Sequence, residues 1–574
     1  MNWKHDRAVS VFVGLVLSAH AVLGVDAARR LTVTHDEYWH LPVGLLNLQT
    51  GRFDYNNLNP PLVRMWSALP LLIADAAPPG RGQAGASDAF GDGFLRDNGE
   101  RYQWLLALGR SMNVLLSLAT GVLLSIWAYE LFGRFAACLA ALLWAVEPNV
   151  LASASLVTMD SGTALFFTST LYVLWKFARA PTWPAAVWLG VMLGLAQLVK
   201  FTSLLLVPLC ITLWFVIRWR NPDIPRQPRS TLLLQWAVAA VMCLGILNAG
   251  YLFRGSFDEL GSYRFRSGSL RGVSQQFAFL RSWPVPLPRD YLLGVDHQRS
   301  VMESQHPVFL DGRWAFDGFP DYFVRATGYK LPHHLQLSLL LAVLFLLWPG
   351  REKRLGRTQV FLWIPIALMF VIGSSTSMQL GLRYILPVLP FVVLFASQVG
   401  RWVQWKNYPL RAAIVCVVAA VAPAAVRYHP NHLAYFNELS GGPTRGYEHL
   451  IDSNIDWGQN LRDLKDYLEE REIGRIGLAY FGTAPPTEMG IEFELPPAGT
   501  PQPGWYAVSV NYLQGRSHAL RDPAGGHFAP EFGAYAYFRS FEPDARIGYS
   551  IYVYHIDQND VAQWFANRRI QGLR

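Results

Sequence analysis

Long apolar blocks without charge constrain this chain more than any other feature. Of its 574 residues, 52% are hydrophobic and 16% are charged, whereas about a quarter of the residues of a soluble protein carry charge. The blocks 8–25, 111–128, 201–217 and 231–253 contain no Asp, Glu, Lys or Arg. A helix needs about 20 mostly apolar residues to cross a bilayer. These blocks therefore predict membrane-spanning helices.

Shorter apolar runs raise the expected number of spans to about eleven. They are 135–146, 161–175, 185–199, 335–348, 360–374, 384–399 and 412–426. We therefore expect a mainly α, multi-pass membrane protein. No small-residue cleavage site follows the first block, so we interpret it as a retained anchor. The four cysteines lie in apolar segments, which predicts no disulfide framework.

The distribution of basic residues predicts how the chain is threaded. With the N-terminus in the cytoplasm, the cytoplasmic connections hold sixteen Lys and Arg, and the short outer connections hold only Lys200 and Arg383. The positive-inside rule describes this bias. Topology thus accounts for the net charge of +8, which gives no reason to expect nucleic acid as a partner. We expect a multi-pass protein of the cell (inner) membrane.

Three long regions fall outside the membrane in this threading: loops at about 26–104 and 254–334, and the tail 427–574. The tail contains leucines at helical spacing after residue 460 and short apolar runs typical of strands. Those runs are 476–481, 506–510 and 549–554. We therefore expect a membrane module over 1–426 and an extracytoplasmic α/β domain over 427–574, which is an ordinary domain size.

The first outer loop carries the residues most suited to chemistry. Thr34 and Glu37 fit the capping box of a helix, and 62–73 predicts a helix on the membrane surface with Arg64 at its polar edge. Asp36 and Glu37 are adjacent carboxylates. Transfer of a sugar from a phosphate-linked donor needs a carboxylate that takes the proton of the acceptor hydroxyl. A structural interpretation, in which both acids only favour the helix start, stays open.

Three further charged residues lie at the outer ends of spans. Asp160 is a functional candidate because ionisable groups at membrane depth are costly; the alternative is an N-cap of the following span. Lys200 and Arg383 are suited to bind a lipid phosphate, and the alternative is that they snorkel to lipid headgroups.

A divalent metal ion is a candidate cofactor, because histidines and carboxylates can coordinate one together. The candidate ligands are Asp36, Asp160 and His306, and His35 and His40 are further histidines of the same outer regions. No spacing among them enforces a metal site. The sequence therefore leaves the metal requirement open.

Several segments, taken in order, resemble polytopic glycosyltransferases of the GT-C type. The nearest resemblance is to the dolichyl-phosphate-mannose protein mannosyltransferase clan and its bacterial polyprenyl-phosphate-dependent members, with lipid A aminoarabinose transferases more distant. The segments are Asp36-Glu37, 51–53, Asn59-Pro-Pro-Leu62, Glu147-Pro148, 158–160, 200–202, 383–390, 435–443 and 452–459.

The resemblance implies an inverting transfer of a sugar, with mannose as the candidate, from a polyprenyl-phosphate donor to an acceptor hydroxyl at the outer face. The implied partners are this donor, membrane lipids, and an acceptor that is a protein, lipid or glycan. The implied roles are Asp36 as base with Glu37 assisting, Asp160 in the same cavity, Lys200 and Arg383 at the donor phosphate, and His40, Asn59 and Arg64 in the first-loop site.

Two features separate the chain from the protein mannosyltransferases. Those enzymes carry His where Asn59 stands, and a β-trefoil domain in the second long loop, whose pattern 254–334 lacks. Protein as the acceptor is therefore an open question. An alternative function is a transporter or flippase of a lipid-linked sugar, although the repeated halves typical of transporters are not seen. A third interpretation makes Asp456-Trp-Gly-Gln459 a docking site on a membrane anchor.

Overall fold

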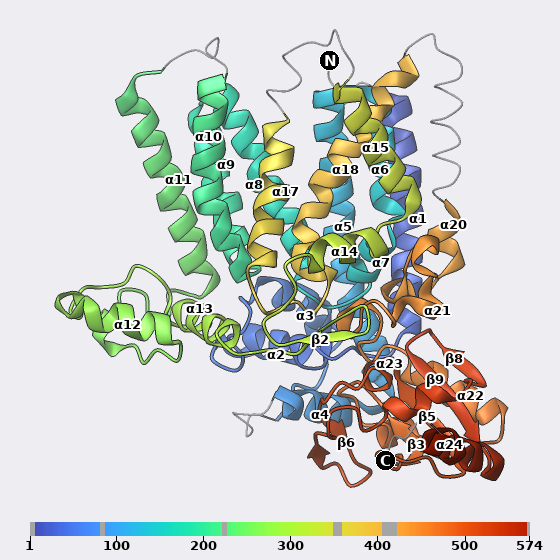
Figure 1. Cartoon of the computed structure of the whole chain (residues 1–574). Helices are drawn as coiled ribbons and strands as arrows, with labels where there is room; N and C mark the ends of the chain where they lie inside the picture. Colours follow the sequence, from blue (N-terminus) through green and yellow to red (C-terminus); the bar gives the residue numbers. More distant parts are fainter. Residues whose placement is uncertain (1–5, 81–86, 221–226, 348–358, 405–421, 571–574) are drawn as a thin grey trace.

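The computed structural model describes residues 6–80, 87–220, 227–347, 359–404 and 422–570. Long helices form a bundle, and the two long loops and the tail lie together beyond one end of it (Figure 1). The first helix begins at the opposite end of the bundle, and the C-terminus lies in the tail (Figure 1). The predicted threading places the loops and the tail on one side in the same way.

The bundle helices correspond to the predicted apolar blocks. Ten of the eleven predicted segments are helical, and the eleventh, 412–426, lies mostly outside the described residues. The bundle contains α1 (Arg7–Arg30), α5 (Tyr102–Phe132), α6 (Arg134–Ala145), α7 (Pro148–Ala154), α8 (Asp160–Arg179), α9 (Trp183–Gln197), α10 (Leu206–Arg220), α11 (Arg229–Gly250), α15 (His333–Leu347), α17 (Val360–Ser374) and α18 (Leu389–Ser397), with 3-10 segments η3 (Phe201–Leu205), η6 (Leu382–Val388) and η7 (Gln398–Gln404).

Helix length and composition mark the protein as a multi-pass membrane protein. Among the described residues, five helical stretches can cross a membrane, or six if α6 and α7, which are bent by 63°, form one span. Other apolar helices, such as α9 and α17, have 15 residues each, fewer than the roughly 20 that a straight span needs. The count of eleven spans therefore stays a prediction.

The first outer loop forms two helices across the end of the bundle, α2 (Glu37–Thr50) and α3 (Leu62–Ile73), followed by α4 (Ser87–Asn98). The bounds of α3 agree with the predicted helix. The expectation that Arg64 lies at a polar edge is wrong, because its side chain is 1% exposed. Since α3 packs between α2 and α5, the side that carries Arg64 faces inward, and Leu72 and Ile73 are exposed instead.

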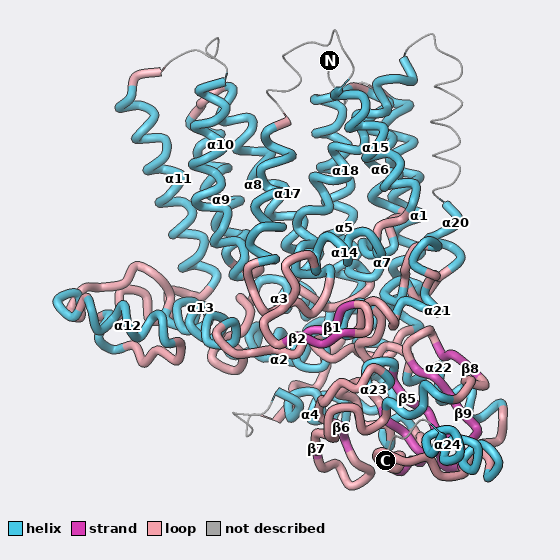
Figure 2. The backbone as a smooth tube through the Cα atoms, viewed as in Figure 1, coloured by secondary structure: helices cyan, strands magenta, loops and turns pink. Residues whose placement is uncertain are grey.

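The second outer loop contains α12 (Gly268–Gln276), α13 (Arg289–Met302), the hairpin strands β1 (Val308–Leu310) and β2 (Arg313–Ala315), and α14 (Tyr322–Lys330). The stretch with α12 projects sideways from the end of α11, and α13 returns toward the bundle (Figure 2). The described part of this loop contains two short strands, far fewer than a β-trefoil needs.

The tail contains a five-stranded mixed sheet in the order β4-β3-β5-β9-β8. Strand β3 runs parallel to β4 and β5, and β9 runs antiparallel to β5 and β8. The three predicted strands are present as β3, β5 and β9, and the predicted leucines of α22 are buried. The main elements are α22 (Leu461–Glu470), β3 (Arg475–Ala479), β4 (Glu492–Glu494), β5 (Gly504–Ser509), β8 (Ala545–Ile547), β9 (Ile551–Ile556) and α24 (Gln558–Ile570).

The chain from residue 422 onward also contains short elements outside the five-stranded sheet. They are α20 (Ala422–Arg427), α21 (Pro443–Gly446), α23 (Val510–Leu513), β6 (Leu520–Arg521) and β7 (His527–Phe528). The division into domains at residue 427 stays a prediction.

The crossing of α2 over α3 predicts a stability effect at Gly44. A Cβ atom there would lie 2.1 Å from the Arg64 carbonyl oxygen, whereas one at Gly14 of α1 would meet nothing within 4 Å. We expect Gly44→Ala to cost about 1–3 kcal/mol through overpacking and to lower the thermal unfolding midpoint of the detergent-solubilised protein. The control Gly14→Ala should leave the midpoint unchanged or raise it, because Ala favours helix. Equal midpoints for the two variants would contradict this packing.

Candidate active site

A cavity of about 530 Å³ lies where the bundle meets the outer loops. Side chains from the first loop, α8, α13, α17 and η6 line it. Much of the wall is apolar, including Leu58, Met159 and Ile372. The structure brings six predicted site residues together in this wall: Asp36, His40, Asn59, Asp160, Lys200 and Arg383.

Two ion pairs organise the polar part of the cavity. Arg383 Nη1 lies 2.8 Å from Asp36 Oδ2, and Lys200 Nζ lies 2.9 Å from Asp160 Oδ1. Tyr384 lies between the cations, with its ring centroid 5.4 Å from the Arg383 guanidinium carbon and 5.5 Å from Lys200 Nζ. The four charged side chains are largely but not fully buried. A ligand in this part of the cavity therefore meets the two ion pairs, and Arg299 of α13 lines the cavity as a third cation.

Element ends place these charges. Asp160 is the first residue of α8, where the helix dipole favours an acid. Lys200 stands in extended backbone between α9 and η3, so its side chain leaves the helical path and reaches Asp160. The Leu62 N–H donates to the Leu198 carbonyl oxygen at 3.0 Å, which ties the first loop to the end of α9.

The tail positions Arg383 from the other side. The Leu382 N–H donates to Asn454 Oδ1 at 3.0 Å, and Ser453 Oγ donates to the Leu380 carbonyl oxygen at 2.7 Å. The Trp457 ring lies 4.1 Å from the Arg383 guanidinium carbon, close enough for a cation–π contact. Residues of the motif Asp452–Gln459 therefore hold the cavity-wall segment that carries Arg383. The sequence singled out this motif but not the contact of Trp457 with Arg383.

The electrostatic surroundings keep Asp36 ionised. Burial raises the pKa of the Asp36 carboxyl, but the positive charge of Arg383 and its hydrogen bond outweigh burial and hold this pKa below its usual value. Burial lowers the pKa of His40 to about 4, so its imidazole is neutral at neutral pH. His40 Nδ1 has no hydrogen-bond partner among the described residues. The site thus contains the ionised carboxylate of Asp36 and the neutral imidazole of His40, whose Nδ1 can form a further hydrogen bond.

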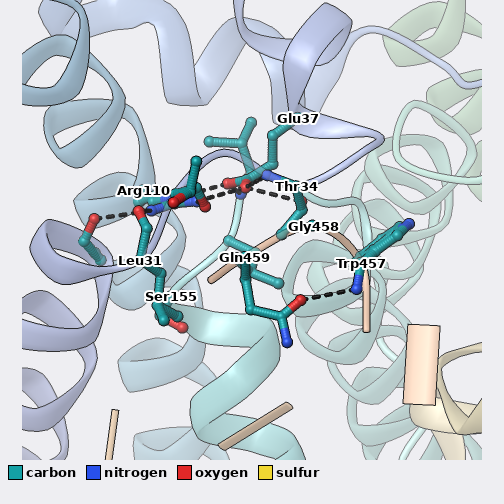
Figure 3. Close-up of polar contacts among 12 residues, drawn as sticks. Leu31, Thr34, Glu37, Arg110, Ser155, Trp457, Gly458 and Gln459 are labelled. Carbon is teal, nitrogen blue, oxygen red and sulfur yellow. Dashed lines mark hydrogen bonds and ion pairs between the residues drawn. The ribbon is translucent and has the colours of Figure 1, made fainter. Parts of the chain in front are cut away.

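Glu37 lies behind the cavity rather than in it. Its carboxylate and the Arg110 guanidinium form a fully buried pair, with Oε2 and Nη2 2.7 Å apart (Figure 3). The same carboxylate accepts hydrogen bonds from the Thr34 N–H and from the Val157 N–H. The helix begins at Glu37 with Asp36 as its N-cap, and the Thr34 hydroxyl donates to Glu37, so the predicted capping box with Thr34 as N-cap is only half formed. Glu37 does not line the cavity. Its geometry is that of a positioning residue, which differs from the assisting role that the resemblance implies.

Two other predicted site residues also lie apart from the cavity lining. Arg64 is buried without lining the cavity, and its Nε and Nη1 have no partner among the described residues. His306 pairs through Nε2 with the Val301 carbonyl oxygen at 2.9 Å. Across the described part of the chain, no three His, Cys, Asp or Glu residues are grouped to hold a metal ion. The candidate ligands Asp36, Asp160 and His306 therefore do not converge.

The buried ion pair of Glu37 with Arg110 predicts that Arg110→Met strongly destabilises the protein. Removing one partner of a buried ion pair costs about 3–5 kcal/mol, so the thermal unfolding midpoint of the purified protein should fall steeply. Arg475→Met is the matched control, because Arg475 and Glu494 are 63% and 59% exposed and exposed pairs contribute about 0–1 kcal/mol. If both variants unfold at the wild-type temperature, Glu37 and Arg110 do not anchor the loop.

The model of the dolichyl-phosphate-mannose-protein mannosyltransferase family matches residues 107–246, from within α5 to within α11. This stretch contains Asp160 and Lys200. Among curated proteins, no sequence matches the chain.

Several solved structures are similar to the chain at low sequence identity. ArnT from Cupriavidus metallidurans bound to undecaprenyl phosphate has 13% identity and a TM-score of 0.45, over 96% of this chain and 98% of that chain. The Archaeoglobus fulgidus oligosaccharyltransferase in the apo form has 13% identity and a TM-score of 0.46, over 92% and 75%. The S. cerevisiae protein O-mannosyltransferase Pmt1–Pmt2 complex bound to the sugar donor has 11% identity and a TM-score of 0.48, over 74% of this chain and 90% of that chain.

The family match covers the part of the bundle that supplies one of the two ion pairs of the cavity. It confirms the resemblance that the sequence motifs indicate. The protein is a glycosyltransferase.

Proposed function

We propose that the protein transfers a sugar from a polyprenyl-phosphate donor to an acceptor hydroxyl at the outer membrane face, with inversion. The observation that carries this proposal is the shared cavity, in which Asp36 lies beside Arg383, with Lys200 and Asp160 in the same wall. The matching family is named for a donor of this chemical class, dolichyl-phosphate mannose. Mannose is therefore the candidate sugar.

The lining of the cavity suits such a donor. Apolar side chains, among them Met369 and Ile372, favour contact with an isoprenoid chain. Lys200 and Arg383 offer two cations to one phosphate, and charge-assisted hydrogen bonds of this kind are the strong ones. The neutral imidazole of His40 and the amide of Asn59 line the same cavity, where they can bond sugar hydroxyls.

The proposed reaction is a single displacement. The acceptor oxygen forms a bond to the anomeric carbon, the bond from that carbon to the phosphate oxygen breaks, and Asp36 takes the hydroxyl proton. Polyprenyl phosphate leaves with an additional negative charge. Lys200 and Arg383 stabilise this charge as it develops, which is the electrostatic contribution that lowers such barriers most. Attack opposite the leaving group inverts the anomeric centre.

Donor binding and basicity are coupled through Arg383. A phosphate that shares the Arg383 guanidinium weakens its pairing with Asp36. Because Arg383 is the main cause of the low pKa of Asp36, that pKa then rises toward its usual value. A carboxylate of higher pKa is a stronger base. The bound donor thus prepares the group that completes the transfer.

The threading of the chain belongs to the same proposal. The N-terminus is cytoplasmic, the module 1–426 holds the donor in the membrane, and the tail 427–574 lies outside the cytoplasm. The contacts of Asn454, Ser453 and Trp457 around Arg383 support a tail that completes the site. In this arrangement the acceptor reaches Asp36 from the outer side.

Replacing the base tests the proposal. We expect Asp36→Asn to lower the loss of label from polyprenyl-phosphate [³H]mannose by about 10²–10⁴-fold, as removal of a general base does. Wild-type protein in nanodiscs gives the reference rate. Asp54→Asn is the control, because Asp54 lies in the same loop but pairs with Arg52 at an exposed position.

Undecaprenyl phosphate binding, followed by thermal shift, should be retained in Asp36→Asn and shows that the variant is folded. Unchanged turnover in this variant would remove Asp36 from the role of base. Donor binding by wild-type protein that moves the lipid between leaflets without any loss of label would favour the flippase.

The phosphate site makes a second prediction. We expect the double variant Lys200→Met/Asp160→Asn to bind undecaprenyl phosphate about 10- to 150-fold more weakly, the range for hydrogen bonds to charged groups. Changing both partners avoids an unpaired buried carboxylate. The control Lys176→Met/Glu130→Gln removes a pair at the far end of α8. Equal dissociation constants for the two variants and wild type would show that Lys200 does not hold the phosphate.

A further inference from the structure

The chain that follows α11 forms a lateral lobe, which we define as residues 252–283. It projects sideways from the end of α11 at the level of α13, and α12 forms its outer part (Figure 1, Figure 2). Helix α11 is one of the stretches that can cross a membrane, and it ends at Gly250. The lobe therefore begins at the membrane boundary and extends along it.

Large apolar side chains are exposed throughout this lobe. Their exposed fractions range from 40% to 73%, with Phe279 the most exposed. They are Leu252, Phe253, Phe257, Val273, Phe277, Phe279 and Trp283. Exposed apolar patches of this kind mark surfaces that contact a partner or a membrane. Trp, Phe and Leu side chains are typical of the apolar face of segments that lie in the membrane interface.

Exposed arginines lie between these apolar residues. The lobe contains Arg254, Arg264, Arg266, Arg271 and Arg281, all exposed, and none forms an ion pair with a described residue. Its acids are Asp258 and Glu259, and Asp258 pairs with Arg289 outside the lobe. Two further acids, Asp296 of α13 and Glu303 directly after it, accept hydrogen bonds from backbone N–H groups of the lobe. Within the lobe itself, five arginines stand against two acids, so positive charge is in excess beside the aromatic side chains. Basic segments at a membrane surface attract anionic lipids.

We propose that the lateral lobe binds the outer lipid surface, with its aromatic side chains among the headgroups and its arginines on anionic lipid phosphates. A lipid surface accounts for three observations together: continuity with the span α11, exposed aromatic side chains, and exposed arginines that form no ion pair with a described residue. Amphipathic segments with basic and aromatic residues bind membrane interfaces through both contributions.

The lobe also adjoins the donor cavity. It leads into α13, whose Val295, Gln298 and Met302 line that cavity. A lobe held on the lipid surface keeps this wall next to the lipid from which the donor enters; this step rests on the proposed function. Loss of the arginines should then raise the KM for a donor that resides in the bilayer more than the KM for a donor that is dispersed in detergent.

Spin labels measure the position of the lobe in the full-length protein. In a background with all four cysteines replaced by alanine, a nitroxide is attached at Phe279→Cys or Val273→Cys. The protein is reconstituted in nanodiscs of phosphatidylcholine with or without phosphatidylglycerol. We expect both labels to be more accessible to oxygen than to a water-soluble nickel complex, and more so with phosphatidylglycerol.

Two control labels calibrate the measurement. Leu234 on α11 is exposed in a span and should resemble lipid, and Phe532 in the tail is exposed and should resemble water. The proposal is overturned if both lobe labels give the nickel accessibility of Phe532. A label that is immobilised only when two proteins share a nanodisc would show instead that a second copy of the chain covers the lobe.

Charge removal tests the arginines separately. We expect Arg266→Gln/Arg271→Gln/Arg281→Gln to abolish the effect of phosphatidylglycerol on the labels. The KM for a long-chain polyprenyl-phosphate mannose in these nanodiscs should rise several-fold, while the KM for a short-chain donor in detergent stays the same. Equal phosphatidylglycerol effects with and without the arginines would overturn their role. Absence of turnover with either donor would contradict the proposed function but not the label positions.

Discussion

The buried ion pair of Glu37 with Arg110 fixes the loop on which the site depends. Enclosing two charges costs free energy unless their remaining polar atoms find partners. Here the guanidinium also donates to three carbonyl oxygens at the end of α1, and the carboxylate also accepts from the Val157 N–H before α8. The pair thus joins α1, α2 and α5 to the segment before α8. Asp36, the neighbouring residue, is thereby held at the cavity wall.

The different partners of Glu37 and Asp36 explain why these two adjacent acids behave differently. The carboxylate of Glu37 is saturated by its partners and has no access to the cavity. Asp36 has one strong partner, Arg383, and that partner is itself held by the tail through Asn454 and Trp457. A ligand that competes for Arg383 changes the state of Asp36 and leaves the Glu37 anchor unchanged. Glu37 therefore forms a fixed ion pair, and its neighbour Asp36 forms an ion pair that a ligand can replace.

Sequence patterns predicted the features that depend on residues close together in the sequence. The bounds of α3, the contact of Glu37 with the Thr34 N–H, and the leucines of α22 depend on residues within a few positions. The clustering of Asp36, Asp160, Lys200 and Arg383 in one cavity was predicted through the resemblance to a family. The burial of Arg64 and the anchoring of Glu37 by Arg110, 73 positions away, depend on tertiary packing that no local pattern encodes. Strands β4 and β8 have three residues each, too few for a recognisable alternation.

The level of the charges in the bundle suits the lipid-linked donor of the proposed function. Lys200 follows α9, and Arg383 lies at the start of η6, so both cations lie where helices end. A polyprenyl phosphate places its phosphate at the headgroup level and its chain in the bilayer. Cations deeper in the bundle would require the phosphate to lose its hydration in hydrocarbon, which is costly. Cations farther out would require the chain to leave the bilayer. The end of the bundle, beside the lateral lobe, is the level at which neither cost arises.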